Sequence, residues 1–224
     1  MNFLSDAVNW LNDPLNWTNP DGILALARQH LFLSGAAVLL ACLVAWPLGL
    51  WLGHTGRGGE FVVALANLGR AVPVLALLTI FAVTPLGFGA PSVIVALAVF
   101  AVPPLLANAY LGLREIDPEV REAARGMGLS GWQLLRRVEV PLAVRYLAAG
   151  FRTASVQVVA TATLAAYVDG GGLGTIIRLG FGVDISVGGG RILAGAILVA
   201  VLCLALDGIL ALTQRAVTPR PLRS

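Results

Sequence analysis

The chain has 224 residues, of which 58% are hydrophobic and only 12% are charged, and its mean hydropathy is +0.85. This composition excludes an ordinary soluble domain and predicts a protein that crosses a membrane several times. The net charge of +3 does not indicate a nucleic-acid partner. Cys42 and Cys203 both lie inside apolar runs, so neither a disulfide framework nor a metal site is indicated.

Residues 1–29 are mixed in polarity and are predicted to form an extracytoplasmic or interfacial segment. The apolar residues between Phe3 and Leu11 can line one face of a short helix. Trp10 and Trp17 are typical of a membrane–water interface. A plain surface helix is favoured over a partner contact for this segment.

Five apolar runs follow, each long enough to cross about 30 Å of hydrocarbon as a helix. They cover residues 30–52, 60–83, 91–113, 142–166 and 190–212. The sequence therefore predicts an all-α, polytopic membrane domain over 30–212, followed by a tail at 213–224.

Residues 114–141 form the one long polar stretch between these runs, and a segment with so many charges cannot sit in hydrocarbon. Asp117 can cap a first short helix, with Pro118 at its first position. Gly126 and Gly128 are predicted to end that helix in a sharp turn.

A second short helix is predicted to begin at Ser130, because Gln133 follows three residues later and completes a capping-box spacing. Leu129, Trp132 and Leu135 recur at intervals of three, so they are expected to share one exposed apolar face. An exposed apolar face of this kind indicates a protein partner.

The same stretch carries a pattern of the form E-A-A-x3-G-x9-I-x-L-P. It begins with Glu122, Ala123 and Ala124, continues with Gly128, and ends with Val138-Glu139-Val140-Pro141. This pattern resembles the EAA loop in the membrane subunits of bacterial ABC importers. The resemblance implies a five-helix permease of the type I importer kind, whose loop 114–141 docks on an ATPase.

Several polar residues lie within or beside the predicted spans, where an ionised group costs about 2.5–3.5 kcal/mol. The candidates for lining a translocation path are Asn67, Arg70, Pro73, Arg152, Gln157, Thr161 and Thr163. The alternative is that they form hydrogen bonds between helices, and the two interpretations are evenly matched. For Asp207, close to the inner end of its predicted span, the interhelical role is favoured.

Three further segments indicate one group within the ABC importer permeases. They are Arg70-Ala71-Val72-Pro73, Gly150-Phe151-Arg152-Thr153-Ala154 and the glycine-rich stretch 161–174. Together they resemble the permeases of osmoprotectant importers, which carry glycine betaine, choline, carnitine or proline betaine. A permease for an amino acid such as methionine shares the loop and is the main alternative.

The partners follow from the resemblance. It implies a second permease, identical or paralogous, two ABC ATPase subunits and an extracytoplasmic substrate-binding protein. The chain has no phosphate-binding loop, so it is expected to bind no cofactor and to catalyse no reaction itself. ATP and magnesium are expected on the partner ATPase.

Arginine asymmetry predicts the orientation in a bacterial inner membrane. With the polar loop in the cytoplasm, the N-terminus is outside and the C-terminus inside. The cytoplasmic loops then hold most of the loop arginines, namely Arg57, Arg114, Arg121, Arg125, Arg136, Arg137, Arg215, Arg220 and Arg223. The opposite side holds only Arg28 and Arg178.

Three other classes of protein fit less well. An ion-driven transporter would place paired acids inside its spans. A membrane enzyme would cluster His, Asp or Glu near one face, whereas His30 and His54 are expected on opposite faces. A purely structural membrane protein would not need a loop with an exposed Trp132.

Overall fold

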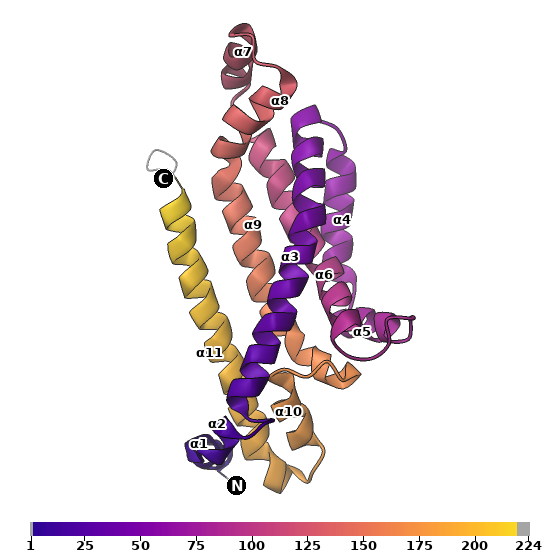
Figure 1. Cartoon of the computed structure of the whole chain (residues 1–224), viewed down its shortest axis with the longest axis vertical. Helices are drawn as coiled ribbons and strands as arrows, with labels where there is room; N and C mark the ends of the chain where they lie inside the picture. The colour runs from indigo at the N-terminus through magenta and orange to yellow at the C-terminus, as the bar shows by residue number, and fades with distance from the viewer. Residues whose placement is uncertain (1, 219–224) are drawn as a thin grey trace.

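The structure is a computed structural model that describes residues 2–218, apart from the side chain of Arg70. Every regular element within that range is helical, as predicted (Figure 1). The α-helices are α1 (Phe3–Asn12), α2 (Leu15–Thr18), α3 (Ile23–Thr55), α4 (Gly59–Ala71), α5 (Val74–Ala82), α6 (Ala90–Arg114), α7 (Pro118–Gly126), α8 (Gly131–Leu134), α9 (Val140–Thr161), α10 (Gly174–Phe181) and α11 (Ile185–Val217). A π-helical turn, η1 (Leu135–Glu139), joins α8 to α9, and a 3-10 helix, η2 (Ala162–Val168), follows α9.

Three helices in the described range are long and apolar enough to cross a membrane. They are α3, with α2 leading into it, α6 and α11, and they coincide with the first, third and fifth predicted spans. Both α3 and α11 extend beyond the predicted limits, because the structure continues them as helix into more polar sequence. Residues 213–217, predicted as tail, therefore belong to α11, and 219–224 lie outside the described residues.

The second predicted span, 60–83, is not one straight helix. α4 and α5 meet at an angle of 88°, so they form either a broken span or a re-entrant pair. Pro73 lies at the break, and Val72 before it is extended, which is the conformation that a following proline favours. The prediction that residues 60–83 cross the membrane as one span remains a prediction.

The fourth predicted span, 142–166, corresponds to α9 and the beginning of η2. α9 is not among the three helices that are apolar enough to span by composition. It nevertheless packs along both α6 and α11 and runs in their direction (Figure 1). The prediction that α9 crosses the membrane remains a prediction.

Small residues bring the central helices close together. A Cβ at Gly49 or Gly53 of α3 would lie within 2.7 or 2.8 Å of a Cβ on α6. Across the other face of α6, a Cβ at Gly150 of α9 would lie 2.6 Å from the Cβ of Asn108. Close backbone approach through glycine is a common basis of helix association in membranes. It makes α3, α6 and α9 the packed centre of the fold.

Different short helices lie at the two ends of the elongated molecule (Figure 1). α7 and α8 lie at one end, towards which the C-terminal end of α11 also points. α1, α2 and α10 lie at the other end, with the N-terminus. At that end α1 packs on α11, with Ala7 fully buried, so the N-terminal segment has a docked position within the chain.

Candidate functional site

The polar stretch 114–141 folds as two short helices at one end of the molecule. The carboxylate of Asp117 accepts a hydrogen bond from the backbone N–H of Glu119 at 2.9 Å, so Asp117 caps α7 as predicted. After α7, Gly128 adopts a left-handed φ of +84°, which favours glycine. The predicted turn at this residue is confirmed.

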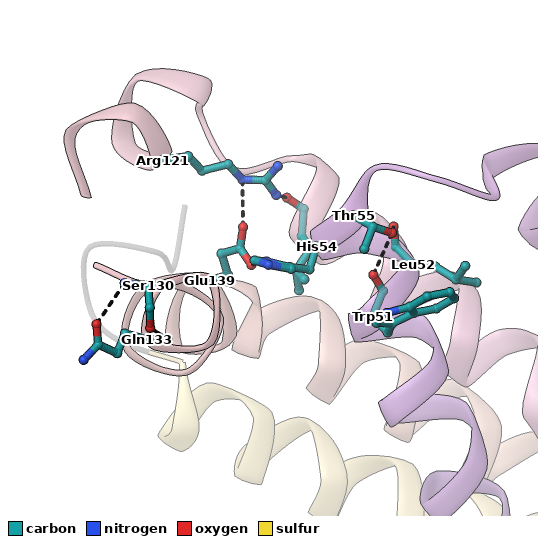
Figure 2. Close-up of polar contacts among 9 residues, drawn as sticks. Trp51, Leu52, His54, Thr55, Arg121, Ser130, Gln133 and Glu139 are labelled. Carbon is teal, nitrogen blue, oxygen red and sulfur yellow. Dashed lines mark hydrogen bonds and ion pairs between the residues drawn. The ribbon is translucent and has the colours of Figure 1, made fainter. Parts of the chain in front are cut away.

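The second helix also begins as predicted. Ser130 Oγ accepts from the backbone N–H of Gln133, and Gln133 Oε1 accepts from the backbone N–H of Ser130 at 2.9 Å (Figure 2). This reciprocal pair is a complete capping box. The segment α7–α8 is thus held in shape by its own caps. We call residues 117–139 the coupling segment.

The three apolar residues predicted to share one exposed face differ in how far they are exposed. Trp132 is 63% exposed, with the Arg136 guanidinium 5.4 Å from its ring centre, and Leu129 is half-buried. Leu135 is partly buried on this chain's own cluster of Leu113, Ile116 and Ala143, and it also lines, together with Trp132, the apolar groove described below. α8 ends at Leu134 and the π turn starts at Leu135.

The remaining motif residues lie on α7, in the turn after it and at the start of α9, and they differ in exposure. Glu122, Ala123, Gly128 and Pro141 are exposed, whereas Ala124 is buried. Beyond the motif, Met127 and Val120 also expose apolar side chains at this end. Arg125, Arg136 and Arg137 are exposed there too, so this end presents a surface of apolar, acidic and basic side chains.

Glu139 is fully buried at the base of the coupling segment. Its Oε2 accepts a hydrogen bond from Nδ1 of His54, in the last turn of α3, at 2.5 Å. Its Oε1 lies 3.2 Å from Nε of Arg121 on α7, an ion pair whose angle does not complete a hydrogen bond (Figure 2). Arg121 also donates from Nη2 to the backbone carbonyl of Leu113 in α6. The three side chains join four elements and are called the polar bridge below.

An apolar groove of about 990 Å³ opens beside the polar bridge. One wall is the outer face of α3, including Trp46 and Trp51, and the other is α8 with the turn after it, including Trp132. His54 lines the end of the groove. α3 and the coupling segment are thus spaced apart along this groove and meet at His54 and Glu139.

Among the predicted path residues, Arg152 has a clear partner. Its Nε and Nη2 donate to the two carboxylate oxygens of Asp207 on α11, at 2.6 and 2.7 Å. This pair fits the interhelical alternative, and path lining by Arg152 remains a prediction. Asp207 lies ten residues, or about 15 Å, before the end of α11.

The other predicted path residues form no single cluster in the described structure. Thr161 and Thr163 direct their hydroxyls to backbone carbonyls one turn earlier, and Gln157 is exposed on α9. Asn67 and Pro73 are exposed on α4 and at the break before α5, and both of these helices pack on α6. The side chain of Arg70 lies outside the described residues.

Hydrogen bonds from Gln29 and His30 of α3 hold the glycine-rich stretch after η2. Neither residue was predicted to have this role. Gln29 bonds to both the carbonyl of Gly170 and the N–H of Gly172. The buried ring of His30 bonds through Nε2 to the Val159 carbonyl at 2.8 Å, and Nδ1 faces the N–H of Leu173 at 3.3 Å. No group of three side chains suited to a metal ion occurs within the part of the chain that the structure describes.

Comparison with known proteins decides the family. The sequence pattern of the binding-protein-dependent transport system inner membrane component matches residues 32–219. This chain belongs to that family. It is a permease subunit of a multi-pass inner-membrane transport system, as the loop motif predicted.

Curated relatives match nearly the whole permease. The glycine betaine/carnitine/choline transport system permease protein OpuCB of Bacillus subtilis is 37% identical over 92% of this chain and 93% of its own length. The carnitine transport permease protein OpuCB of Listeria monocytogenes is 37% identical over 92% of each chain. The osmoprotectant import permease protein OsmW of Salmonella typhimurium is 32% identical over 92% of this chain and 96% of its own length.

Solved structures share the fold of the permease. A chain of the MetNI methionine ABC transporter, in an inward-facing conformation, superposes with a TM-score of 0.76 over 88% of this chain and 96% of that chain. The identity between the two is 23%. At that identity the likeness establishes the type I importer permease fold and nothing about substrate.

The polar bridge was not foreseen from the sequence. Glu139 occupies an unspecified position of the loop motif, and His54 was only expected to lie on the opposite face from His30. A signal was present, because Glu139 is an acid between two valines next to a span, where burial without a partner is unfavourable. Its partners lie 85 and 18 positions away, and only the folded permease identifies them.

Proposed function

We propose that this permease forms the membrane pathway of an ATP-driven importer for a quaternary ammonium osmoprotectant such as glycine betaine, choline, carnitine or proline betaine. The observation that carries the proposal is 37% identity, over nine-tenths of both chains, to a permease named for glycine betaine, carnitine and choline. Methionine, the main alternative, has support only from a likeness of fold at 23% identity.

Energy would reach the permease through the coupling segment. We propose that it docks on an ABC ATPase subunit, with the exposed Trp132 as apolar anchor and Glu122 facing a basic group. ATP and magnesium would be bound by that partner alone. Closure of two ATPase subunits would displace two coupling segments, one on each of two permeases, and switch the pathway between its two openings.

Substrate choice would depend largely on a separate extracytoplasmic binding protein. Quaternary ammonium groups are recognised by cages of aromatic rings. The described aromatic side chains of the permease offer one close pair, Trp46 and Phe151, at 6.2 Å between ring centres. A binding protein outside the membrane would place the cage there and leave a weakly polar passage to the permease.

The orientation follows from the same scheme. We infer that the end with α7, α8 and the C-terminal end of α11 is cytoplasmic and that α1 is outside. Single cysteines in a cysteine-free background, at Arg125 and at Asn9, would be labelled by an impermeant maleimide in intact spheroplasts. Labelling of the Asn9 position alone supports this orientation, and labelling of the Arg125 position alone reverses it.

Uptake tests both the substrate and the coupling segment. A host without its own betaine uptake would carry the permease with its ATPase and binding protein, and would be given labelled glycine betaine, choline or methionine. We expect ATP-dependent uptake of betaine or choline, lost in Gly128→Asp, while ATP hydrolysis and membrane insertion persist. Uptake of methionine alone would overturn the substrate proposal.

The matched control is Gly126→Ala. Gly126 is helical, and a Cβ there would meet nothing within 4 Å, so this variant should transport normally. Gly128 differs in its left-handed φ. Normal uptake by Gly128→Asp would refute docking through the coupling segment.

A further inference from the structure

The polar bridge lies where the coupling segment meets the transmembrane helices. Glu139 belongs to the π turn η1, His54 to the end of α3, and Arg121 to α7. Arg121 also reaches the last turn of α6 through the Leu113 carbonyl. The buried carboxylate of Glu139 thus connects the coupling segment to α3 directly and to α6 through Arg121 (Figure 2).

The polar bridge is not the arrangement that stability alone favours. A fully buried carboxylate loses its hydration, and an ion pair seldom repays that loss in full. Replacing all the members of such a group with apolar residues of similar volume is often neutral or stabilising, whereas removing one member alone leaves its partner's charge uncompensated. The apolar cluster of Leu113, Ile116 and Ala143 packs against Leu135 in the same turn. A role other than stability is therefore indicated for Glu139.

The connections between the coupling segment and the surrounding helices indicate what role Glu139 has. The coupling segment is continuous in sequence with α6 and α9, so a movement of its tip reaches both helices through the backbone. α3 has no backbone connection of this kind and reaches the coupling segment through side chains alone. It packs on the last turn of α6, where a Cβ at Gly53 would lie 2.8 Å from the Cβ of Leu113. The groove separates most of α3 from α8, and the polar contact between α3 and the coupling segment is the hydrogen bond of His54 to Glu139.

A π turn at this place supports the same conclusion. π-helical turns are rare and recur at functional sites. Here the turn shifts the register between α8 and α9, and Glu139, its last residue, points towards α3. The buried carboxylate therefore lies in the irregular turn that joins α8 of the coupling segment to α9.

We propose that Glu139, His54 and Arg121 are positioning residues that make α3 move together with the coupling segment. The yield of transport from ATP hydrolysis depends on that connection. This inference rests on the proposed function, in which the coupling segment receives its movement from an ATPase. It assigns a role to His54, which lies outside the loop, and to Arg121 and Glu139, which lie in the loop at positions that its motif does not specify. It predicts a specific defect, which is hydrolysis without matching transport.

The test uses the complete importer in proteoliposomes, with ATPase subunits and binding protein. ATP hydrolysed per substrate molecule transported is measured for the parent, Glu139→Leu, His54→Leu and the double variant. We expect the ratio to rise about tenfold in each single variant, within the usual range of coupling between distant sites. In the double variant the ratio of ATP hydrolysed to substrate transported should rise no further than in either single variant, because both changes break the same connection.

The matched control is Thr55→Ala. Thr55 is next to His54, but its hydroxyl bonds only to carbonyls of its own helix, at Trp51 and Leu52 (Figure 2). Its ratio should equal that of the parent. If the polar bridge only stabilised the fold, Glu139→Leu would lower the yield of assembled complex, or hydrolysis and transport together, with an unchanged ratio. That result would overturn the inference.

A second readout does not depend on the substrate. Spin labels on cysteines introduced at Leu43 of α3 and Arg125 of α7, both exposed, report the distance between the two elements. In the parent this distance should stay narrow and equal in nucleotide-free and ATP-bound complexes, and it should broaden or shift in Glu139→Leu. A distance that already changes with nucleotide in the parent refutes joint movement. A failed uptake of betaine and choline with an unchanged distance refutes the substrate proposal alone.

Discussion

The pair of Arg152 and Asp207 allows a quantitative prediction about stability. Removing one partner leaves a charge within a membrane helix, which costs about 2.5–3.5 kcal/mol at a helix centre. The side chains are 35% and 38% exposed, so part of that charge can be screened by what surrounds the helices. We therefore expect Arg152→Leu and Asp207→Leu each to lower the free energy of unfolding.

The double variant should recover most of that loss. With both side chains replaced by leucine no charge remains unpaired, and the net loss should be smaller than that of either single variant. The assay is reversible unfolding of the purified permease in mixed detergent, followed by tryptophan fluorescence. A shift of 1.4 kcal/mol is about a tenfold change in the folded-to-unfolded ratio, which this method detects easily.

The same variants decide between the two interpretations of Arg152. If the double variant is destabilised by the sum of the single effects, the two side chains are not energetically coupled and the reasoning fails. If the double variant is stable and transports normally, Arg152 serves helix association. If it is stable but does not transport, Arg152 belongs to the translocation path.

Two glycines provide further predictions. Gly150→Ala should destabilise the permease by about 1–3 kcal/mol, because the new methyl would lie 2.6 Å from Asn108 Cβ on α6. In Gly208→Ala nothing lies within 4 Å, so that control should be neutral or slightly stabilising in the same unfolding assay. At Gly128 the open space makes backbone strain the main term, about 1–2 kcal/mol for alanine. Gly128→Asn should therefore retain more uptake than Gly128→Ala, since asparagine tolerates a left-handed φ better, and the reverse order would exclude strain as the cause.

Features that depend on neighbouring residues in the chain were predictable from the sequence. The Asp117 cap, the Ser130–Gln133 capping box and the turn at Gly128 were each predicted at the right residue. A cap is a bond between residues two or three apart, so its spacing is visible in the sequence. The apolar runs behind α3, α6 and α11 were visible for the same reason, because a membrane requires a continuous apolar stretch.

The break between α4 and α5 was harder to predict, although its proline was noted. Pro47, Pro103 and Pro104 lie inside continuous helices, whereas Pro73 coincides with a bend of 88°. Proline removes one hydrogen bond in each case. Whether the helix continues depends on the packing of its neighbours, and α3 and α6 are held closely by their small residues.

The sequence by itself determined that this protein is an all-helical membrane permease and where its coupling segment begins and turns, because those properties depend on composition and on short spacings. The tertiary structure alone decided which charges meet. Glu139 with His54 and Arg121, Arg152 with Asp207, and His30 with the backbone near Leu173 all join separate elements. A buried polar group must find a partner, but its sequence position does not say which one, and only the packing of the helices brings the two together.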